Sequence, residues 1–295
     1  MRLLVVGGNG LLGSNLVQVA TRRGWEVCTT YHSSPPASDV PKKKLDLKDH
    51  GAIGQVISEY RPDVVVNAGA MTDVDACEER PEEAFDINAR APGELAAQCA
   101  NADIDVVHTS TDYVFDGTSE TRYPESAETN PLQVYGETKL IGEQKVLERA
   151  RSALVPRLSF VWGIHRSSRE LTGFPAWLDS KLRAEEEVPL FTDQWVTPTR
   201  AGKAAETILS LAEKGNSGLF NIASQSCVTP FEFGTLILKR IDRDPGLLTK
   251  GSMLDVERPA DRPGFTCLDT SKVERSLGWK MPSLREDLSA VEGYL

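Results

Sequence analysis

The stretch Gly7-Gly-Asn-Gly-Leu-Leu-Gly13 decides how this chain can fold. The apolar run Leu3–Val6 precedes it, and a segment of helical period, Leu11–Arg23, follows it. A glycine-rich turn between a strand and a helix is the fingerprint of dinucleotide-binding folds, because glycines permit the tight turn and the close approach of a pyrophosphate. The helix N-terminus adds amide donors. We therefore expect five residues to bind a dinucleotide: Gly7, Gly10, Leu11, Leu12 and Gly13.

Apolar runs alternate with helical segments downstream of this turn, which predicts an α/β fold with a doubly wound parallel sheet of the Rossmann type. The expected strands are Leu3–Val6, Glu26–Thr30, Asp63–Asn67, Ile104–Thr109 and Ala153–Leu158. The expected helices are Leu11–Arg23, Gly51–Tyr60, Glu82–Ala100 and Gln133–Ala150. Residues 1–163 would form the NAD(P)-binding domain, with the sheet completed by about 196–222 (helix Thr199–Lys214, strand Gly218–Ile222). Residues 164–295 would form a smaller C-terminal substrate-binding region.

The end of the second strand bears on the choice between NAD and NADP. An NAD site usually has an acid about twenty residues after the glycines, to hold the ribose 2′-hydroxyl. Here Thr29-Thr-Tyr-His-Ser-Ser34 contains none, and the first acid is Asp39. Because His32 and Ser33 can donate to a 2′-phosphate, with Arg22 or Arg23 in reach, NADP is favoured and NAD stays an option.

Further cofactor contacts are expected at two other strand ends. Asp46 and Leu47 follow the lysine run Lys42–Lys44, which we interpret as a solvated face, and would flank the adenine. Small residues follow the third strand at Asn67, Ala68 and Gly69, as close backbone approach to a cofactor requires. A plain loop would look the same.

Composition limits the partners. The formal net charge of −10 argues against nucleic acid or an anionic membrane. The five cysteines are widely spaced without a Cys-x-x-Cys pair, so reduced thiols in a cytoplasmic protein are the simplest interpretation. The N-terminus runs straight into the first strand, and neither a cleavable leader nor a bilayer-length apolar run is recognisable. The oligomeric state stays open, with a homodimer as one option.

Tyr135 and Lys139 lie in Val134-Tyr-Gly-Glu-Thr-Lys-Leu140. Residues four apart share a helix face, so the lysine can favour the ionised form of the phenol. An aromatic ring packed under a lysine stem gives the same spacing. The glycine turn and Ser110-Thr111-Asp112, at the expected end of a strand, favour a nicotinamide site with a proton donor and a hydroxyl.

Motifs across the chain resemble those of the dTDP-4-dehydrorhamnose reductase family, a branch of the extended short-chain dehydrogenases/reductases. They are Asn67-Ala-Gly-Ala-Met-Thr-Asp-Val-Asp75, Ser110-Thr-Asp-Tyr-Val-Phe-Asp-Gly117, Tyr135-Gly-Glu-Thr-Lys-Leu-Ile-Gly-Glu143, Asp193-Gln194 with Thr197-Pro-Thr199, and Arg258-Pro259 with Leu268-Asp-Thr-Ser-Lys272. The resemblance implies transfer of hydride from NAD(P)H to C4 of a nucleotide-linked 4-keto-6-deoxy sugar, most favourably dTDP-4-dehydrorhamnose.

The resemblance also implies residue roles. Tyr135 would protonate the developing alkoxide, Lys139 would bind the nicotinamide ribose and lower the tyrosine pKa, and Thr111 would hydrogen-bond the reacting oxygen. The residues expected beside the sugar are Thr72, Val74, Asp112, Tyr113 and Phe160. His108 is interpreted as a core residue, and no clustered His, Cys or carboxylates suggest a metal.

The chain departs from the family pattern at the substrate end. Phe160 stands where a tryptophan is usual, with an aromatic displaced to Trp162, and Val196 stands where a glycine is usual. Two alternatives therefore remain. One is a nucleotide-sugar epimerase or dehydratase, although Tyr113 replaces the second carboxylate that dehydratases need. The other is a non-catalytic NADP-binding subunit resembling the regulatory subunit of methionine adenosyltransferase.

Overall fold

Strand β1 (Arg2–Val6) lies at the centre of the fold, and its side chains alternate between two cores. Leu3 and Val5 face one layer of helices, while Leu4 and Val6 face the other. A strand buried on both faces reads as a continuous apolar run, which is why the sequence Arg2-Leu-Leu-Val-Val6 predicts a central parallel strand. The structure is a computed structural model that describes residues 1–241 and 243–295.

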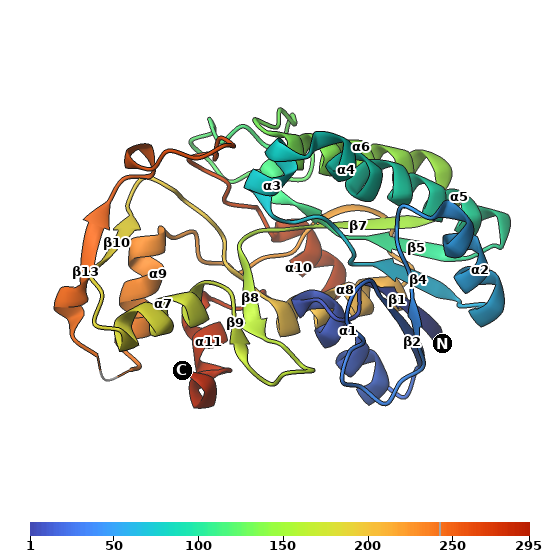
Figure 1. The fold of residues 1–295 in the computed structure, drawn as a ribbon, viewed down its shortest axis with the longest axis horizontal. Helices are drawn as coiled ribbons and strands as arrows, with labels where there is room; N and C mark the ends of the chain where they lie inside the picture. The colour runs from blue at the N-terminus through green and yellow to red at the C-terminus, as the bar shows by residue number, and fades with distance from the viewer. Residues whose placement is uncertain (242) are drawn as a thin grey trace.

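The main sheet is parallel and confirms the expected Rossmann-type fold (Figure 1). Its strands lie in the order β12 (Gly218–Asn221), β7 (Ala153–Leu158), β5 (Asp105–His108), β4 (Val64–Asn67), β1, β2 (Glu26–Tyr31) and β3 (Lys42–Lys44), with β6 (Ser110–Thr111) also paired to β7. The strand β3 was missed, because three lysines do not read as a strand. It pairs with β2 at the edge of the sheet, where charged side chains can reach water.

Helices cover both faces of this sheet (Figure 1). One layer contains α1 (Leu11–Arg22), α8 (Ala201–Glu213) and α10 (Ser271–Leu277). The other contains α2 (His50–Tyr60), α5 (Ala91–Asn101) and α6 (Val134–Arg149). The position of α10 was not expected, since it lies within the segment assigned to the substrate-binding region but packs beside α8.

The helix expected over Glu82–Ala100 is not continuous. It consists of α4 (Pro81–Phe85), the π-helical turn η1 (Asp86–Arg90) and α5. Pro92 has no backbone N–H, so the Asn88 carbonyl lacks its normal donor four residues later, and the wider turn accommodates this loss. The continuous helix expected from the sequence did not take this proline into account. The short helix α3 (Val74–Glu79) precedes α4.

A second core lies beside the sheet, at the left of Figure 1. Its strands are β8 (Val161–Ile164), β9 (Leu171–Thr172), β11 (Thr199–Arg200), β10 (Val188–Phe191) and β13 (Leu248–Gly251). Its helices are α7 (Phe174–Arg183), α9 (Pro230–Leu238) and α11 (Leu284–Ser289). Fully buried Trp162 and Phe233 meet edge to face in this core, with ring centroids 5.5 Å apart.

Helix α6 packs closely on η1 through a glycine. A Cβ atom added at Gly142 would overlap the Asn88 carbonyl oxygen. Because both positions belong to the backbone, neither can turn aside as a flexible side chain would. We expect Gly142→Ala to destabilise the fold by about 1–3 kcal/mol. Gly51→Ala in α2 serves as the control, because its added Cβ meets nothing closer than 3.4 Å. Urea unfolding followed by circular dichroism measures both variants, and equal midpoints would contradict this packing.

Candidate active site

Two adjoining cavities open along the carboxyl ends of the parallel strands, where α/β sheets bind ligands. Their volumes are about 390 and 530 Å³, and both are lined by Gly10, Ala68 and Ala70. The glycine turn follows β1, the small residues 68–70 follow β4, and Thr111 ends β6. The topology thus brings together three of the motifs that the sequence analysis selected.

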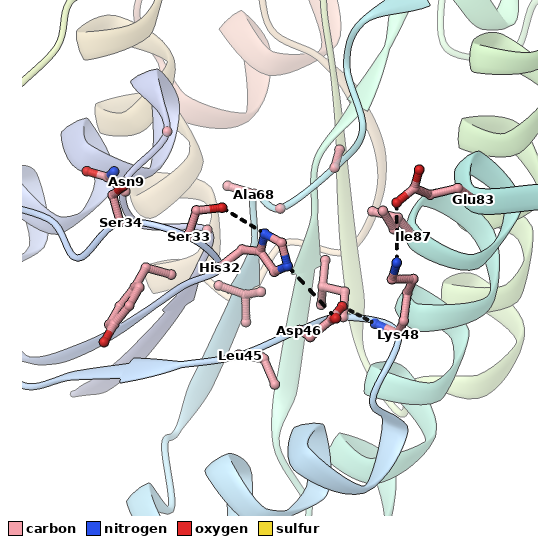
Figure 2. Close-up of a pocket in the computed structure, with 17 residues that line it drawn as sticks. Asn9, His32, Ser33, Ser34, Leu45, Asp46, Lys48, Ala68, Glu83 and Ile87 are labelled. Carbon is pink, nitrogen blue, oxygen red and sulfur yellow. Dashed lines mark hydrogen bonds and ion pairs between the residues drawn. The ribbon is translucent and has the colours of Figure 1, made fainter. Parts of the chain in front are cut away.

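The smaller cavity contains the residues expected around the adenosine half of a dinucleotide (Figure 2). His32 Nδ1 lies 3.0 Å from Ser33 Oγ, and His32 Nε2 lies 3.8 Å from Asp46 Oδ2. Asp46 Oδ1 accepts from the Lys48 amide (2.9 Å), and Lys48 Nζ contacts Glu83 (3.3 Å). The missed strand β3 therefore brings a carboxylate beside His32, although the end of β2 itself has none.

The glycine turn forms a cradle at the start of α1. Gly7 has φ +79°, and a Cβ atom at Gly13 would overlap the Gly7 carbonyl, so larger residues do not fit. The N-cap Gly10 offers no side-chain hydrogen bond, and the first turn of α1 contains no acid. Its free amides are therefore available to an anionic group such as a pyrophosphate.

Thr111, Tyr135 and Lys139 line the larger cavity together. Lys139 is buried, and its Nζ donates to the Thr109 carbonyl at 2.6 Å, which joins α6 to the end of β5. Thr111 Oγ1 donates to Asp112 Oδ1 (3.1 Å) and accepts from the Tyr113 amide (3.2 Å). The same cavity is therefore lined by two polar side chains from the strand end and two from α6: Thr111, Asp112, Tyr135 and Lys139.

Burial controls the electrostatics of this space. It raises the pKa of Tyr135, while a hydrogen bond with Thr111 acts in the opposite direction. It lowers the pKa of Lys139 to about 8 and raises the pKa of Asp112 to about 6. The expectation of a lowered tyrosine pKa is therefore corrected for this structure, since desolvation of the phenol is the largest influence on that pKa and Asp112 raises it further. Tyr135 is thus held as a protonated phenol, the form that can donate.

Asn67 was expected to contact the cofactor, but its side chain points into the protein. It is fully buried, donates from Nδ2 to His108 Nδ1 (3.2 Å) and accepts from the Gly69 amide (3.1 Å). His108 is a core residue, as expected, and burial lowers its pKa well below the usual range. The neutral pair supports the loop 68–70, which lines both cavities.

Asn88 was missed by the sequence analysis. Its amide accepts from the Met71 N–H and donates to the Met71 carbonyl, both at 2.9 Å, and it also donates to Thr138 Oγ1 (3.3 Å). These bonds connect the loop bearing Thr72 to Thr138 on α6. The signal that could have revealed Asn88 is Pro92, because it marks the interrupted helix that turns Asn88 inward.

A third cavity, of about 550 Å³, adjoins the cavity that Thr111, Tyr135 and Lys139 line. The two cavities share Tyr113 and Phe160. The apolar wall of the third cavity includes Phe174, Trp177, Pro189, Phe191, Pro230 and Val256. Two arginines also line it: Arg258 lies 5.0 Å from the Phe191 ring centroid, and Arg262 pairs with Asp75 at 2.9 Å. The space can take an apolar ring together with an anionic group.

The three residues that depart from the family pattern, Phe160, Trp162 and Val196, do not all lie at the same cavity. Phe160 and Val196 line the larger cavity, and Phe160 has the left-handed φ of 44°. Thr72, Val74, Asp112 and Tyr113 line it as well. Trp162 is fully buried in the second core, so it does not replace the tryptophan that the family pattern places beside the sugar.

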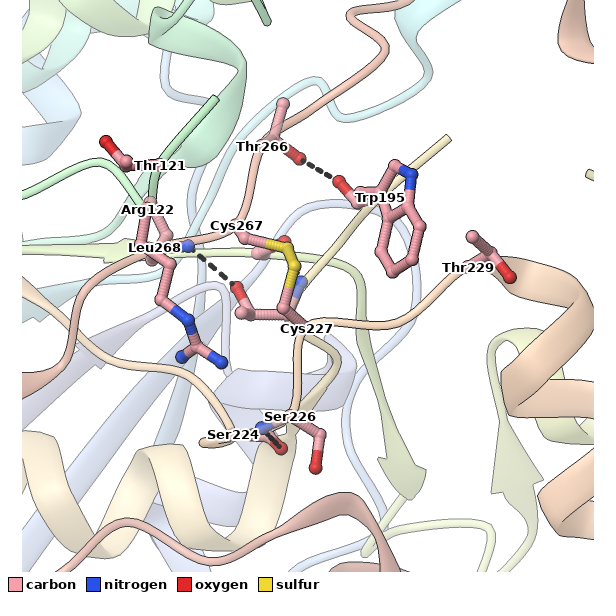
Figure 3. The surroundings of a disulfide bond; sticks show 12 residues. Thr121, Arg122, Trp195, Ser224, Ser226, Cys227, Thr229, Thr266, Cys267 and Leu268 are labelled. Atoms are coloured by element: carbon pink, nitrogen blue, oxygen red, sulfur yellow. Dashed lines mark hydrogen bonds between the residues drawn. A yellow bond between two sulfur atoms is a disulfide. The ribbon is translucent and has the colours of Figure 1, made fainter. Parts of the chain in front are cut away.

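Cys227 and Cys267 form a disulfide, which corrects the interpretation that all five cysteines are reduced (Figure 3). The bond joins the segment before α9 to the segment that follows Arg258 and Arg262. Sequence spacing could not reveal it, because the partners are 40 residues apart. Cys28, Cys77 and Cys99 are free and buried.

Within residues 1–241 and 243–295, no helix combines the length and the apolar character needed to cross a membrane. In the same ranges, no group of three or more His, Cys, Asp or Glu side chains is arranged to hold a metal ion.

The sheet, the glycine turn and the clustered Thr111, Tyr135 and Lys139 define an extended short-chain dehydrogenase/reductase. The family model described as "RmlD substrate binding domain" matches residues 1–292. The chain belongs to this family, which confirms the resemblance noted in its motifs.

Named relatives agree with this assignment. A probable low-salt glycan biosynthesis reductase of Haloferax volcanii is 46% identical over 292 residues, 99% of this chain and 97% of that protein. A dTDP-4-keto-6-deoxy-D-glucose reductase of Streptomyces niveus is 33% identical, covering 90% of this chain and 88% of that protein. The solved structure of a dTDP-4-dehydrorhamnose reductase of Clostridium acetobutylicum superposes with a TM-score of 0.86 at 27% identity, covering 98% of both chains.

The disulfide can be checked by counting thiols. Protein purified without reductant and denatured in guanidinium should react with a thiol reagent at three sites, because Cys227 and Cys267 are paired. The Cys227→Ser, Cys267→Ser double variant should give the same count before and after reduction. Five reactive thiols in the unreduced, unsubstituted protein would contradict the pairing.

Proposed function

We propose that this protein uses a nicotinamide cofactor to reduce the C4 keto group of a nucleotide-diphosphate 4-keto-6-deoxy sugar, with dTDP-4-dehydrorhamnose as the favoured substrate. The observation that carries the proposal is the meeting of Thr111, Tyr135 and Lys139 in one cavity. This cavity adjoins the glycine cradle on one side and the arginine-lined cavity on the other. The names of the relatives point to the same substrate class.

The residues present fit a dinucleotide. The cradle of Gly7, Gly10 and Gly13 would hold the pyrophosphate, and the cavity around His32, Ser33 and Asp46 would hold the adenosine half. When bound, NADPH or NADH supplies the hydride. NADPH is the proposed preference because His32 and Ser33 can donate to a 2′-phosphate. The negative charge of Asp46, beside His32, acts against this preference.

Tyr135 would act as the proton donor. A negative charge grows on the carbonyl oxygen as hydride reaches the carbon, so a positioned phenol stabilises the transition state more than the ground state. Thr111 adds a second hydrogen bond at this oxygen, and the Lys139 ammonium stabilises the phenolate that remains. In the free protein Asp112 Oδ1 accepts a hydrogen bond from the Thr111 hydroxyl, which would turn from Asp112 to the reacting oxygen when substrate binds.

The third cavity would hold the nucleotide part of the substrate. A guanidinium matches the geometry of phosphate oxygens, so Arg258 would bind a diphosphate, with Arg262 beside it held by Asp75. The aromatic wall formed by Phe174, Trp177 and Phe191 suits a planar base. Because Phe160 lines both cavities, it would lie at the sugar between them.

The role of the proton donor is tested by Tyr135→Phe. With NADPH and dTDP-4-dehydrorhamnose, the unsubstituted protein should oxidise cofactor in proportion to the sugar added. The variant should lose about two to four orders of magnitude in kcat while it keeps its affinity for NADPH. Tyr294→Phe, at a half-exposed position near the C-terminus, is the control and should keep full turnover.

Two outcomes of this experiment would count against the proposal. Ordinary turnover in Tyr135→Phe would remove this residue from the mechanism. Tight NADPH binding without oxidation by this sugar or related 4-keto sugars would favour the non-catalytic, cofactor-binding subunit instead.

Cofactor choice is tested at Ser33. A carboxylate in Ser33→Asp would repel a 2′-phosphate, so the ratio of NADPH to NADH affinity should fall about tenfold or more. Ser58→Asp adds the same charge at an exposed position of α2 and should leave the ratio unchanged. Fluorescence titration measures both affinities. An unchanged ratio in Ser33→Asp would show that this turn does not contact the 2′ position.

A further inference from the structure

A buried ion pair, Glu143 on α6 with Arg157 on β7, lies one helical turn beyond Lys139. Arg157 on β7 donates from Nε to Glu143 Oε1 (2.9 Å) and from Nη2 to Glu143 Oε2 (2.7 Å). Both side chains are only 2% exposed. A charged pair of this kind is expensive to bury and does not by itself stabilise a fold better than apolar residues would. Its position therefore calls for another explanation.

Glu143 continues the catalytic face of α6. Tyr135, Lys139 and Glu143 follow one another at intervals of four residues, so they form one row along the helix. Lys139 and Glu143 are both buried. The carboxylate is thus one helical turn from the ammonium, on the side away from the reacting oxygen.

The other titratable groups around Lys139 come from several elements. His108 on β5 is neutral, because burial lowers its pKa well below the usual range. Burial raises the pKa of the Cys77 thiol on α3 to about 11, so it is neutral near pH 7 as well. Asp112 lies at the strand end with Tyr113, and Arg157 faces Glu143 from β7.

We propose that Glu143 is a positioning residue for the reduction, whose buried carboxylate keeps the Lys139 ammonium charged beside Tyr135. Arg157 fixes the direction of this carboxylate through two hydrogen bonds. The ring of Phe115 supports the guanidinium, with its centroid 5.2 Å from Cζ. The effect on turnover rests on the proposed function, whereas the effect on the charge of Lys139 does not.

The electrostatics of Lys139 agree with this arrangement. Burial lowers the pKa of Lys139 to about 8, and the Glu143 carboxylate is the largest influence in the opposite direction. A lysine pKa near 8 leaves the ammonium charged at neutral pH and lost at higher pH. Without Glu143, the same loss should occur at a lower pH.

The test compares Glu143→Gln with Glu137→Gln on the exposed face of the same helix. The profile of kcat/KM against pH should fall on its basic side about one pH unit earlier in Glu143→Gln, and should be unchanged in Glu137→Gln. Glu143→Asp, which keeps the charge, should restore the profile. The pH dependence of the Kd for NADPH should move in parallel, because Lys139 is expected to bind the nicotinamide ribose.

A purely structural role is distinguished by changing the partner. Arg157→Gln also breaks the pair but leaves the carboxylate, so its basic limb should not move to lower pH. If Glu143→Gln folds poorly in thermal unfolding, the double variant Glu143→Leu, Arg157→Met removes both charges as an apolar pair. This double variant should still show the earlier basic limb.

Three results would overturn the inference. They are superimposable profiles for Glu143→Gln and the unsubstituted protein, equal shifts in Glu143→Gln and Arg157→Gln, or an unshifted double variant. Failure of the proposed function looks different, because the unsubstituted protein would then not oxidise NADPH at any pH. The pH dependence of NADPH binding would still report on Glu143 in that case.

Discussion

The hydrogen bond from Lys139 Nζ to the Thr109 carbonyl is the interaction on which the site depends. It attaches α6 to the place where β5 ends and the Ser110–Asp112 turn begins. Because the ammonium is buried, a helix that slid along the sheet would separate this charge from its acceptor. The relative placement of Tyr135 and Thr111, which come from segments far apart in the sequence, depends on this contact together with the packing of Gly142 against Asn88.

The larger and the third cavity are assembled by both cores. The segment from Arg258 to Leu268 crosses between them: the Ala260 amide donates to Asp75 (3.2 Å), and the Gly264 carbonyl accepts from the Trp195 amide (2.7 Å). Asp75 thereby fixes both the backbone and the Arg262 side chain of this segment. The position of the arginines relative to Tyr113 is therefore set by α3, which belongs to the side of the sheet.

The sequence predicted those features that depend on residues close together in the chain. The apolar runs predicted the strands, the glycine turn predicted the cradle, and the spacing of Tyr135 and Lys139 predicted their common face. The remaining features depend on contacts distant in the chain. Asp46 reaches His32 only because β3 pairs with β2, Cys227 reaches Cys267 across a loop, and the inward turn of Asn88 depends on both Pro92 and Gly142. No period or motif encodes such pairings by itself.

The path of the chain has a consequence for any attempt to divide this protein. After β7 the chain enters the second core through β8, returns to the sheet as α8 and β12, leaves again to α9, returns as α10 and leaves as α11. No single cut would therefore place one core entirely in one fragment and the other core entirely in the other. The parallel sheet with its helices therefore cannot be transplanted as one continuous segment, because α8, β12 and α10 come from the later half of the chain.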